Sequence, residues 1–313
     1  MTRRGLLLFA ALGIAWGIPY LFIKVAVSEL EPGMVVLARS ALAAVLLLPL
    51  ALFRREVGTV LRRWKPMLAY TIVEIVIPWY FLSSAEQHLP SSTAGLLLAA
   101  VPLAGVGVAF LMGRPAALSG LNWVGIAVGM LGVAALVGLD IGGSDLLSVG
   151  EMAIVVVGYA LGPAILSRWM SDLPGVGVVA VSLAGAAIAY VPVVLLTGSW
   201  PAAWPSAQVT IAIIVLAVVC SALAFLFMIG LIAEIGPVRA TTITYVNPAV
   251  AILAGVLVLG ERVTVWTVVG FALVLSGSWL VTQRRREAAT SPPPATEQRA
   301  TGAGPEEASA RLE

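Results

Sequence analysis

The stretch GPVRATTITYVNPAVAILAGVLVLGER, residues 236–262, carries a pattern that occurs a second time in this chain. The earlier copy, LPSSTAGLLLAAVPLAGVGVAFLMGR, occupies residues 89–114. Each copy has an opening proline, a run of small residues, a second proline and a closing glycine before a charged residue: Pro90, Pro102 and Gly113-Arg114, then Pro237, Pro248 and Gly260-Glu261. The matched positions are 147, 146 and 147 residues apart. Solenoid repeats recur every roughly 20–50 residues, so a repeat of about half the chain indicates one duplicated unit.

The composition indicates that lipid, rather than water, is the main solvent of this protein. Of its 313 residues, 60% are hydrophobic and 11% are charged, whereas soluble domains have roughly 25% charged residues. The net charge of +2 offers no basic face, so we expect no nucleic-acid partner. The single cysteine, Cys220, excludes a cysteine-based metal cluster, and His88 is the only histidine on which a histidine-dependent catalytic centre could be built. We therefore expect no metal, no cofactor and no enzymatic activity.

Ten apolar windows follow one another along the chain, and about 20 apolar residues suffice to cross a hydrocarbon core of roughly 30 Å. They are residues 6–27, 33–53, 67–86, 91–112, 119–138, 149–169, 175–197, 208–230, 236–259 and 263–283. The first window exceeds a signal-peptide core of roughly 7–15 residues, so we expect an uncleaved span. We expect one repeat in residues 1–143, a second in 144–286, and a disordered cytoplasmic tail in 287–313, which has few large apolar residues.

Lysine and arginine residues gather on one side of the predicted membrane. If the N-terminus is inside, the inner ends carry Arg3, Arg4, Arg54, Arg55, Arg62, Arg63, Lys65, Arg114, Arg168, Arg239 and Arg284 to Arg286. The outer ends then carry Lys24 and Arg262, with the acidic linker residues Glu29, Glu31, Glu86, Asp140 and Asp145. Cytoplasmic loops collect Lys and Arg, so we expect both termini in the cytoplasm and a multi-pass chain in the lipid bilayer of the inner (plasma) membrane.

Five spans in each repeat is an odd number, so the second repeat must enter the membrane upside down relative to the first. Fainter matches extend the relation: Gly17-Ile18-Pro19 and Lys24 in the first window match Leu161-Gly162-Pro163 and Arg168 in the sixth, 144 residues later. The predicted fold is therefore an all-α integral membrane protein with ten transmembrane helices in two inverted five-helix repeats. This architecture is typical of secondary transporters.

Trp16-Gly17 in the first window, Arg39 in the second, and the closing segments around Pro102 and Pro248 point to a known family. On these residues and the two repeats, residues 6–283 resemble the EamA-like group of the drug/metabolite transporter superfamily. Members usually end the fourth and ninth spans with a Gly-Glu pair; Glu261 matches, whereas Arg114 replaces the first glutamate. The resemblance implies two inverted EamA-type halves that alternate access to one central cavity and usually export amino acids or other small metabolites.

Two charged residues lie well inside predicted spans, where polar side chains are expensive. Glu74 lies near the middle of the third window, where a carboxylate costs about 2.5–3.5 kcal/mol. We interpret it as a proton-coupling and substrate-binding candidate; a helix-to-helix hydrogen bond by a protonated glutamate is the alternative. Arg39 could bind a substrate carboxylate or pair with Glu74 or Glu86, or could extend its head group to the outer lipid surface. Lys24 and Arg168 lie nearer their helix ends, where such extension is easier.

Several aromatic residues lie away from the span ends, where aromatic belts normally form. The candidates for the lining of a central cavity are Trp16, Tyr20, Trp79, Tyr80, Tyr159 and Tyr245. Aromatic bodies with polar tips suit amphipathic solutes, and they attract cations through the ring face. Ordinary helix packing is the alternative for each of them.

Prolines inside the windows predict local breaks in the helices, because each removes a backbone hydrogen bond. The predicted kinks are at Pro19, Pro78, Pro102, Pro163 and Pro248. Broken helices at membrane depth often line transporter sites, so Asn247, beside Pro248 and Tyr245, is a candidate substrate contact from the second half. Packing kinks without any ligand are the alternative.

The sequence as a whole predicts a secondary transporter. We expect a small-molecule substrate, amino acids or related amphipathic solutes, to be exported by alternating access around a central cavity. Protons are the candidate coupling ion, and a homodimer is a candidate assembly. The alternatives are a membrane scaffold that transports nothing, and a membrane-embedded enzyme, for which the sequence offers no nucleophile and base pair.

Overall fold

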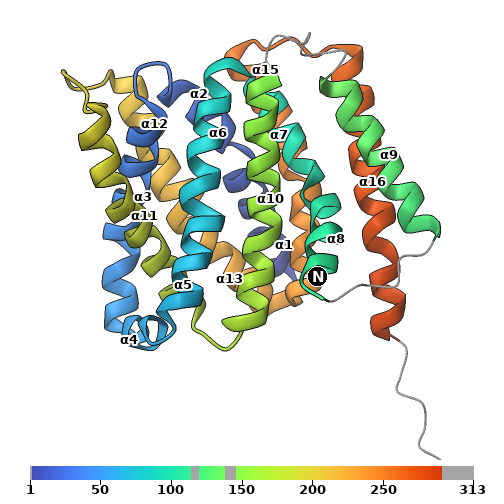
Figure 1. Cartoon of the computed structure of the whole chain (residues 1–313), viewed down its shortest axis with the longest axis horizontal. Coiled ribbons are helices and arrows are strands. Elements are labelled where there is room, and N and C mark those ends of the chain that lie inside the picture. Colours follow the sequence, from blue (N-terminus) through green and yellow to red (C-terminus); the bar gives the residue numbers. More distant parts are fainter. Residues whose placement is uncertain (1, 114–119, 138–145, 291–313) are drawn as a thin grey trace, which may run out of the picture.

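The computed structural model describes residues 2–113, 120–137 and 146–290, and every regular element in those ranges is a helix (Figure 1). The predicted all-α membrane fold is confirmed in this respect. Residues 291–313, which make up most of the predicted tail, lie outside the described part of the chain, as does Arg114. The last described helix continues through Thr290, four residues past the predicted end of the second repeat at 286.

The first half of the chain forms five helical runs. They are α1 (Arg3–Gly17) with α2 (Pro19–Ala26); α3 (Pro32–Phe53); α5 (Trp64–Tyr70), η1 (Thr71–Val76) and α6 (Ile77–His88); α7 (Ser91–Leu97), η2 (Leu98–Ala100) and α8 (Val101–Leu111); and α9 (Gly120–Ala135). The short helix α4 (Glu56–Leu61) links the second run to the third.

The second half forms five more described runs. They are α10 (Leu146–Trp169); α11 (Gly175–Thr197); α12 (Ala207–Ala217), η4 (Val218–Leu223) and α13 (Ala224–Ile235); α14 (Pro237–Ala240), η5 (Thr241–Tyr245) and α15 (Asn247–Leu259); and α16 (Val265–Thr290). Across both halves, eight runs are long and apolar enough to cross a membrane, and the apolar helices Gly120–Ala135 and Val265–Val281 are shorter. The count of ten spans therefore stays a prediction.

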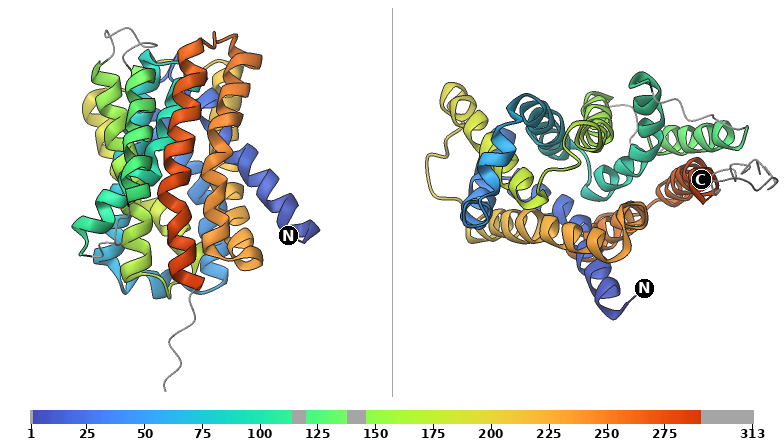
Figure 2. Two further views of the ribbon diagram at one scale, coloured as in Figure 1. Left: turned by 90° about the vertical axis from the view of Figure 1, so that its right-hand side faces the viewer. Right: turned by 90° about the horizontal axis from the view of Figure 1, so that it is seen from below.

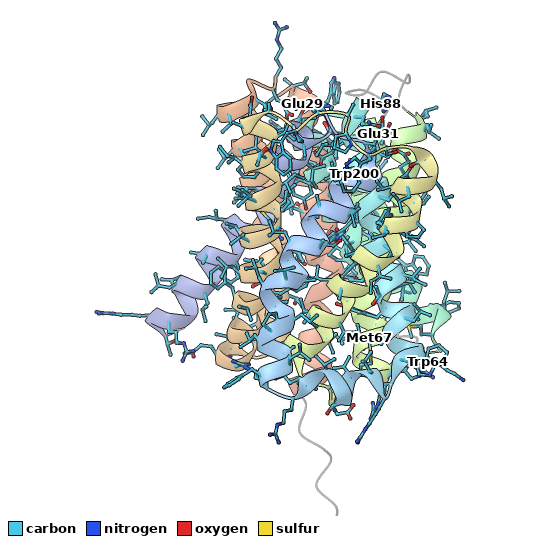
Figure 3. All side chains as sticks on the ribbon, turned by 90° about the vertical axis from the view of Figure 1, so that its left-hand side faces the viewer. Glu29, Glu31, Trp64, Met67, His88 and Trp200 are labelled. Atoms are coloured by element: carbon cyan, nitrogen blue, oxygen red, sulfur yellow. The ribbon has the colours of Figure 1, made fainter. Side chains whose placement is uncertain are left out.

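The two ends of the helix bundle differ in charge. One end carries α4 and its neighbouring basic residues Arg54, Arg55, Arg62, Arg63 and Lys65, and we call it the basic end. Trp64 lies at the basic end, whereas Glu29, Glu31, His88 and Trp200 lie at the opposite end (Figure 3). We call this second end the acidic end. Trp64 and Trp200 are both exposed, one at each end, where indole rings favour the boundary between lipid and water.

The packing of the helices repeats between the halves. The most extensive contacts join α1 to α13, α3 to α11, α6 to α10, α7 to α15, and α9 to α16. In run order these pairs are first with eighth, second with seventh, third with sixth, fourth with ninth, and fifth with tenth. If each run is exchanged for its counterpart in the other half of the chain (first for sixth, second for seventh, and so on), the same five pairs result. The contact pattern therefore has the two-fold relation expected of duplicated halves.

Irregular turns also occur at matching places in the two halves. The π-helices η1 and η4 interrupt the third and eighth runs and begin 147 residues apart, the offset of the sequence repeat. The 3-10 helices η2 and η5 interrupt the fourth and ninth runs, just before the helices that carry Pro102 and Pro248 at their second positions. Single-turn π segments frequently mark functional sites.

Helices α9 and α16 form a pair at one edge of the bundle (Figures 1 and 2). Glycines allow this pair to approach closely. A Cβ atom at Gly125 would lie 2.9 Å from the carbonyl oxygen of Gly277, and one at Gly132 would lie 2.7 Å from the amide nitrogen of Val274. Small residues of this kind let membrane helices pack backbone against backbone.

Candidate functional site

Arg39 is buried in the interior of the bundle. Its side chain is 4% exposed. The guanidinium carbon Cζ lies 3.7 Å from the centroid of the Trp79 ring, so the cation stacks on the indole face. Nη2 donates a hydrogen bond of 3.2 Å to the hydroxyl of Ser221 in η4, which itself donates to the carbonyl of Leu216 in α12. Among the described residues, Arg39 Nε has no hydrogen-bond partner.

Two tyrosines surround this stacked pair. The Trp79 indole lies close enough to the Tyr159 side chain to interact with it. Tyr20 is buried and lies close enough to Tyr159, Glu86 and Arg39 to interact electrostatically with each. We call Tyr20, Arg39, Trp79, Glu86 and Tyr159 the central polar cluster. Its members come from α2, α3, α6 and α10, so helices from both halves of the chain build it.

Glu86 was expected in an outer linker, and that placement was wrong. Helix α6 continues to His88, two residues beyond the predicted window, which puts Glu86 in its last turn with 0% exposure. Neither carboxylate oxygen has a hydrogen-bond partner in the described part of the chain. Glu86 follows Trp79 by seven positions, which is about two helical turns, so both side chains project from one face of α6.

Glu74 lies in η1 against a glycine of α10. Its Oε2 atom is buried and has no hydrogen-bond partner within the described ranges. A Cβ atom at Gly162 would lie 2.7 Å from Glu74 Cδ and nearer still to Oε2, so a larger residue at this position would require the carboxylate to move. One turn earlier, a Cβ at Gly158 would lie 2.7 Å from the Val73 carbonyl oxygen. Glu74 also interacts electrostatically with Tyr159, which connects it to the central polar cluster.

Three of the predicted aromatic residues lie outside this cluster. Trp16 packs edge-to-face on Phe225, with ring centroids 5.8 Å apart. Tyr80 stacks on Tyr190 at 6.3 Å. The Tyr245 hydroxyl donates a hydrogen bond of 3.2 Å to the carbonyl of Ser278 in α16.

Asn247 begins α15 beside the end of α1. A Cβ at Gly17 would lie 3.2 Å from the Asn247 carbonyl oxygen, and the side-chain Oδ1 of Asn247 is buried without a hydrogen-bond partner among the described residues.

The predicted kink prolines fall into two groups. Four occupy the first two positions of a helix, and one lies inside an uninterrupted helix: Pro19, Pro78, Pro102 and Pro248 begin α2, α6, α8 and α15, and Pro163 lies within α10.

Two cavities open at opposite ends of the molecule. The larger, of about 290 Å³, lies between α8 and α10 and includes Met112 and Arg168 in its lining. The smaller, of about 210 Å³, lies at the acidic end and includes Lys24 and Leu259. Two of their lining residues correspond in the repeat, Lys24 with Arg168 and Met112 with Leu259, which are 144 and 147 residues apart.

The backbone at the junction between α6 and α7, at the acidic end, accepts hydrogen bonds from one charged side chain and donates hydrogen bonds to another. Lys24 Nζ donates to the carbonyls of Glu86 and Leu89, at 2.6 and 2.9 Å. The Glu261 carboxylate accepts from the backbone amides of Ser91 and Ser92, at 2.7 and 2.9 Å. A cation at a helix C-terminus and an anion at a helix N-terminus are both favourable placements. We call these contacts of Lys24 and Glu261 the acidic-end latch.

The Glu261 carboxyl lies beyond the end of its span and is half-buried. Burial raises the pKa of Glu261, but hydrogen bonds from Ser92 and Ser91 outweigh burial and hold the pKa below its usual value. The latch carboxylate is therefore charged at neutral pH. Its counterpart in the repeat, Arg114, lies outside the described residues.

Sequence reasoning named Glu86 only as a possible partner of Arg39, and it missed Ser221 and Cys220. All three residues lie close to Arg39. The two-turn spacing from Trp79 was a signal for Glu86. Ser221 and Cys220 lie in η4, which is offset by 147 residues from the segment that contains Glu74, so the repeat could have identified them. No group of three or more His, Cys, Asp or Glu side chains capable of holding a metal occurs in the described ranges.

Comparison with curated proteins finds relatives over most of the chain. The inner membrane transporter YedA of Escherichia coli K12, itself named as uncharacterized, is 31% identical over 278 residues, which cover 85% of this chain and 88% of YedA. The uncharacterized transporter YvbV of Bacillus subtilis is 22% identical over 294 residues, covering 91% and 93% of the two chains.

Comparison with solved structures supports the fold, and comparison with family models gives the family. A crystal structure with 21% identity superposes with a TM-score of 0.65, covering 92% of this chain and 99% of the other, which shows a shared fold. The EamA-like transporter family model matches twice, at residues 3–138 and 148–283, close to the two predicted repeats. Together with the YedA match, these findings show that this membrane protein belongs to the EamA-like transporter family.

Proposed function

We propose that this protein is a secondary transporter that exports small metabolites, namely amino acids or related amphipathic solutes, by alternating access. The family and the relatives named as transporters support the transporter class. Membership of this family also favours a transporter over an enzyme or a scaffold.

The observation that carries the mechanism is a closed polar centre in a molecule that has one cavity at each end. Arg39, Glu86 and Trp79 are all buried, while the cavities at the two ends have volumes of about 290 and 210 Å³. Small-molecule sites have volumes of roughly 300–1,000 Å³, so the larger cavity suits a metabolite rather than a large drug. Because the two halves have matching contacts, they can adopt two conformations, each with a different cavity open. The polar centre is then accessible from one side of the membrane at a time.

We propose the membrane arrangement in the same terms. Ten spans in two inverted repeats, at residues 1–143 and 144–286, place the basic end and both termini in the cytoplasm. The acidic-end latch then closes the outer side. The pairing of α9 with α16 leaves a lipid-facing edge at which two copies could form a homodimer.

Protons are the proposed coupling ion, and Glu74 is the proposed carrier. A buried carboxylate oxygen without a partner is expensive in the membrane interior, which favours a protonated side chain until water or a cation reaches it. The electrostatic contact with Tyr159 gives Glu74 a route by which its charge can influence the central polar cluster. Glu74 would then release its proton when its side of the centre opens.

The test is uptake of labelled amino acids and other metabolites into inverted vesicles that contain the protein, with and without an imposed pH gradient. Accumulation that requires the gradient and disappears in Glu74→Gln supports a proton-coupled exporter. Equilibration without the gradient, unchanged in Glu74→Gln, would refute the coupling role. Absence of transport of every solute tested would contradict the transporter proposal and favour the scaffold.

A further inference from the structure

Glu86 lies beside both members of the acidic-end latch. Lys24 donates to the main-chain carbonyl of Glu86 at 2.6 Å, and Glu261 interacts electrostatically with the Glu86 carboxyl group. We infer that Glu86 is the proton switch of this latch, protonated while the latch is closed and ionised once the latch has opened. This inference rests on the proposed transport function and adds to it the group that controls the outer side of the protein.

The closed structure favours the uncharged form of Glu86. Its side chain is 0% exposed, and neither carboxyl oxygen has a hydrogen-bond partner in the described part of the chain. A buried neutral polar group without a partner costs roughly 1–3 kcal/mol, whereas a buried ion without one costs considerably more. Glu86 therefore resembles Glu74, and its carboxyl group keeps a proton until water reaches it.

The charged and titratable groups around Glu86 come from four other parts of the chain. They are Tyr20 and Lys24 of α2, Arg39 of α3, Tyr159 of α10, and Glu261, which follows α15. Arg39 is held by stacking on Trp79 and by its hydrogen bond to Ser221. Lys24 is held by main-chain carbonyls, so neither cation forms an ion pair with the Glu86 carboxyl group within the described ranges.

Ionisation of Glu86 would weaken the contacts of Lys24. The ammonium group donates to the carbonyls of Glu86, Gln87 and Leu89, at 2.6, 3.4 and 2.9 Å. A hydrogen bond to a carboxylate is stronger than one to a neutral carbonyl, and here the carboxylate belongs to the same residue as the nearest carbonyl. An ionised Glu86 therefore competes for Lys24 and draws it away from the end of α6.

The same ionisation would weaken the contacts of Glu261. Its carboxylate accepts from the backbone amides of Ser91 and Ser92 and is charged at neutral pH. A second negative charge, on Glu86, would repel it. Both effects loosen the junction between α6 and α7 when one proton leaves. In the proposed exporter, a proton taken up from the outer side then closes that side again.

The proton balance determines the sign and the size of the pH dependence. The closed latch holds one proton on Glu86 that the open latch lacks, so opening releases one proton. While the closed form is protonated and the open form is ionised, the ratio of open to closed molecules rises about tenfold for each pH unit. Acid therefore favours the closed latch. Protonation of Glu261 has the opposite effect, because it removes the charge that binds the amides of Ser91 and Ser92.

The experiment measures hydrogen exchange at the amides of Ser91 and Ser92. The purified full-length chain is placed in lipid nanodiscs without solute, from about pH 5.5 to about pH 8, where the lowered pKa of Glu261 keeps that carboxylate ionised. Protection is expressed relative to an unfolded chain at the same pH, which removes the intrinsic pH dependence of exchange. For the wild type we expect protection to fall by about tenfold per pH unit over part of this range.

Two neutral substitutions of Glu86 test the assignment. Glu86→Gln has nearly the same shape as the protonated side chain, and Glu86→Met is a second neutral replacement; both should keep the two amides protected at every pH. Glu151→Gln and His88→Gln are the matched controls. Glu151 accepts from Ser84 away from the latch, and His88 is exposed at the acidic end (Figure 3). Both controls should keep the pH dependence of the wild type.

Three results would overturn the inference. The first is wild-type protection that is constant, or that rises, as the pH rises. The second is a pH dependence in either Glu86 variant equal to that of the wild type. The third is rapid exchange at every pH in both Glu86 variants while the amides of α9, which packs on α16 at the edge of the bundle, stay protected and show that the variants are folded.

Transport assays separate this inference from the proposed function. Accumulation of solutes by a protein whose latch does not respond to pH would overturn the switch and leave the transporter standing. A pH-dependent latch in a protein that transports none of the solutes tested would support the switch and contradict the transporter.

Discussion

Two glycines on one face of α10 should respond differently to the same substitution, because they contact different kinds of atoms. A Cβ at Gly158 would lie 2.6 Å from Pro78 Cγ and 2.7 Å from the Val73 carbonyl oxygen. A Cβ at Gly162 would instead meet the end of the Glu74 side chain, with Cδ at 2.7 Å. A proline ring and a backbone carbonyl cannot rotate away, whereas a glutamate side chain can.

The magnitudes follow from two opposing terms. Replacing glycine by alanine inside a helix stabilises it by about 1 kcal/mol. Overpacking a tight contact costs about 1–3 kcal/mol. For Gly158→Ala the contact is rigid, so we expect a net loss of up to about 2 kcal/mol in the free energy of unfolding. For Gly162→Ala the carboxylate yields, so we expect a net change within about 0.5 kcal/mol.

A double-mutant cycle with Glu74→Ala tests the assignment of these contacts. Removing the carboxylate should make Gly162→Ala stabilising by about 1 kcal/mol, which is a coupling typical of residues in contact. Gly158→Ala should remain as unfavourable as before, because the Val73 carbonyl and Pro78 are still present. The assay is unfolding in mixed detergent micelles. Equal coupling of Glu74 to both glycines, or a larger loss for Gly162→Ala than for Gly158→Ala, would refute the packing described for η1 and α10.

Three further substitutions test other contacts. Tyr190→Phe removes the hydroxyl that donates to the Val76 carbonyl at 2.7 Å and should lower the free energy of unfolding by about 0.5–1.5 kcal/mol; an equal loss in Tyr80→Phe would contradict this reasoning. Lys24→Met should increase hydrogen exchange of the amides at the α6–α7 junction, because three carbonyls lose their donor, and unchanged protection would count against the latch. Glu261→Gln should lower the melting temperature at neutral pH, because the lowered pKa of Glu261 stabilises the fold above the ordinary value of 4.5, and this contribution is lost as the pH falls below 4.5. The gap between wild type and Glu261→Gln should therefore shrink in acid, and a gap that widens there would contradict the sign.

The helices were predictable because each depends on local composition. Every apolar window overlaps a described helical run; the largest difference is seven residues, between the predicted end at 283 and the end of α16 at Thr290. Glu86 illustrates the importance of helix ends. The predicted window ended at residue 86, so Glu86 was assigned to a linker, whereas the last turn of α6 places its side chain in the interior. Helix ends depend on capping and tertiary contacts, here with Lys24, which hydropathy does not register.

The members of the site were only partly predictable because depth in the membrane does not determine the direction in which a side chain points. Tyr20, Arg39, Trp79 and Tyr159 do come together, whereas Trp16, Tyr80 and Tyr245 pack on Phe225, Tyr190 and Ser278. The π-helix η1 rotates the side chains that follow it relative to an α-helix, so a regular periodicity applied across residues 71–76 misplaces them. The 147-residue offset of the repeat could have corrected this error, because it shows that η1 and η4 occupy equivalent places in the two halves.

The central claim is that the cavities at the two ends of the molecule open alternately, and the distances across them test it most directly. In a Cys220→Ala background, spin labels at Met112 and Ser167 span the larger cavity and labels at Ser28 and Leu259 span the smaller. Electron paramagnetic resonance measures each distance with and without the transported solute and at two pH values. Alternating access predicts that one distance increases whenever the other decreases. Two distances that change together, or that never change, would contradict it.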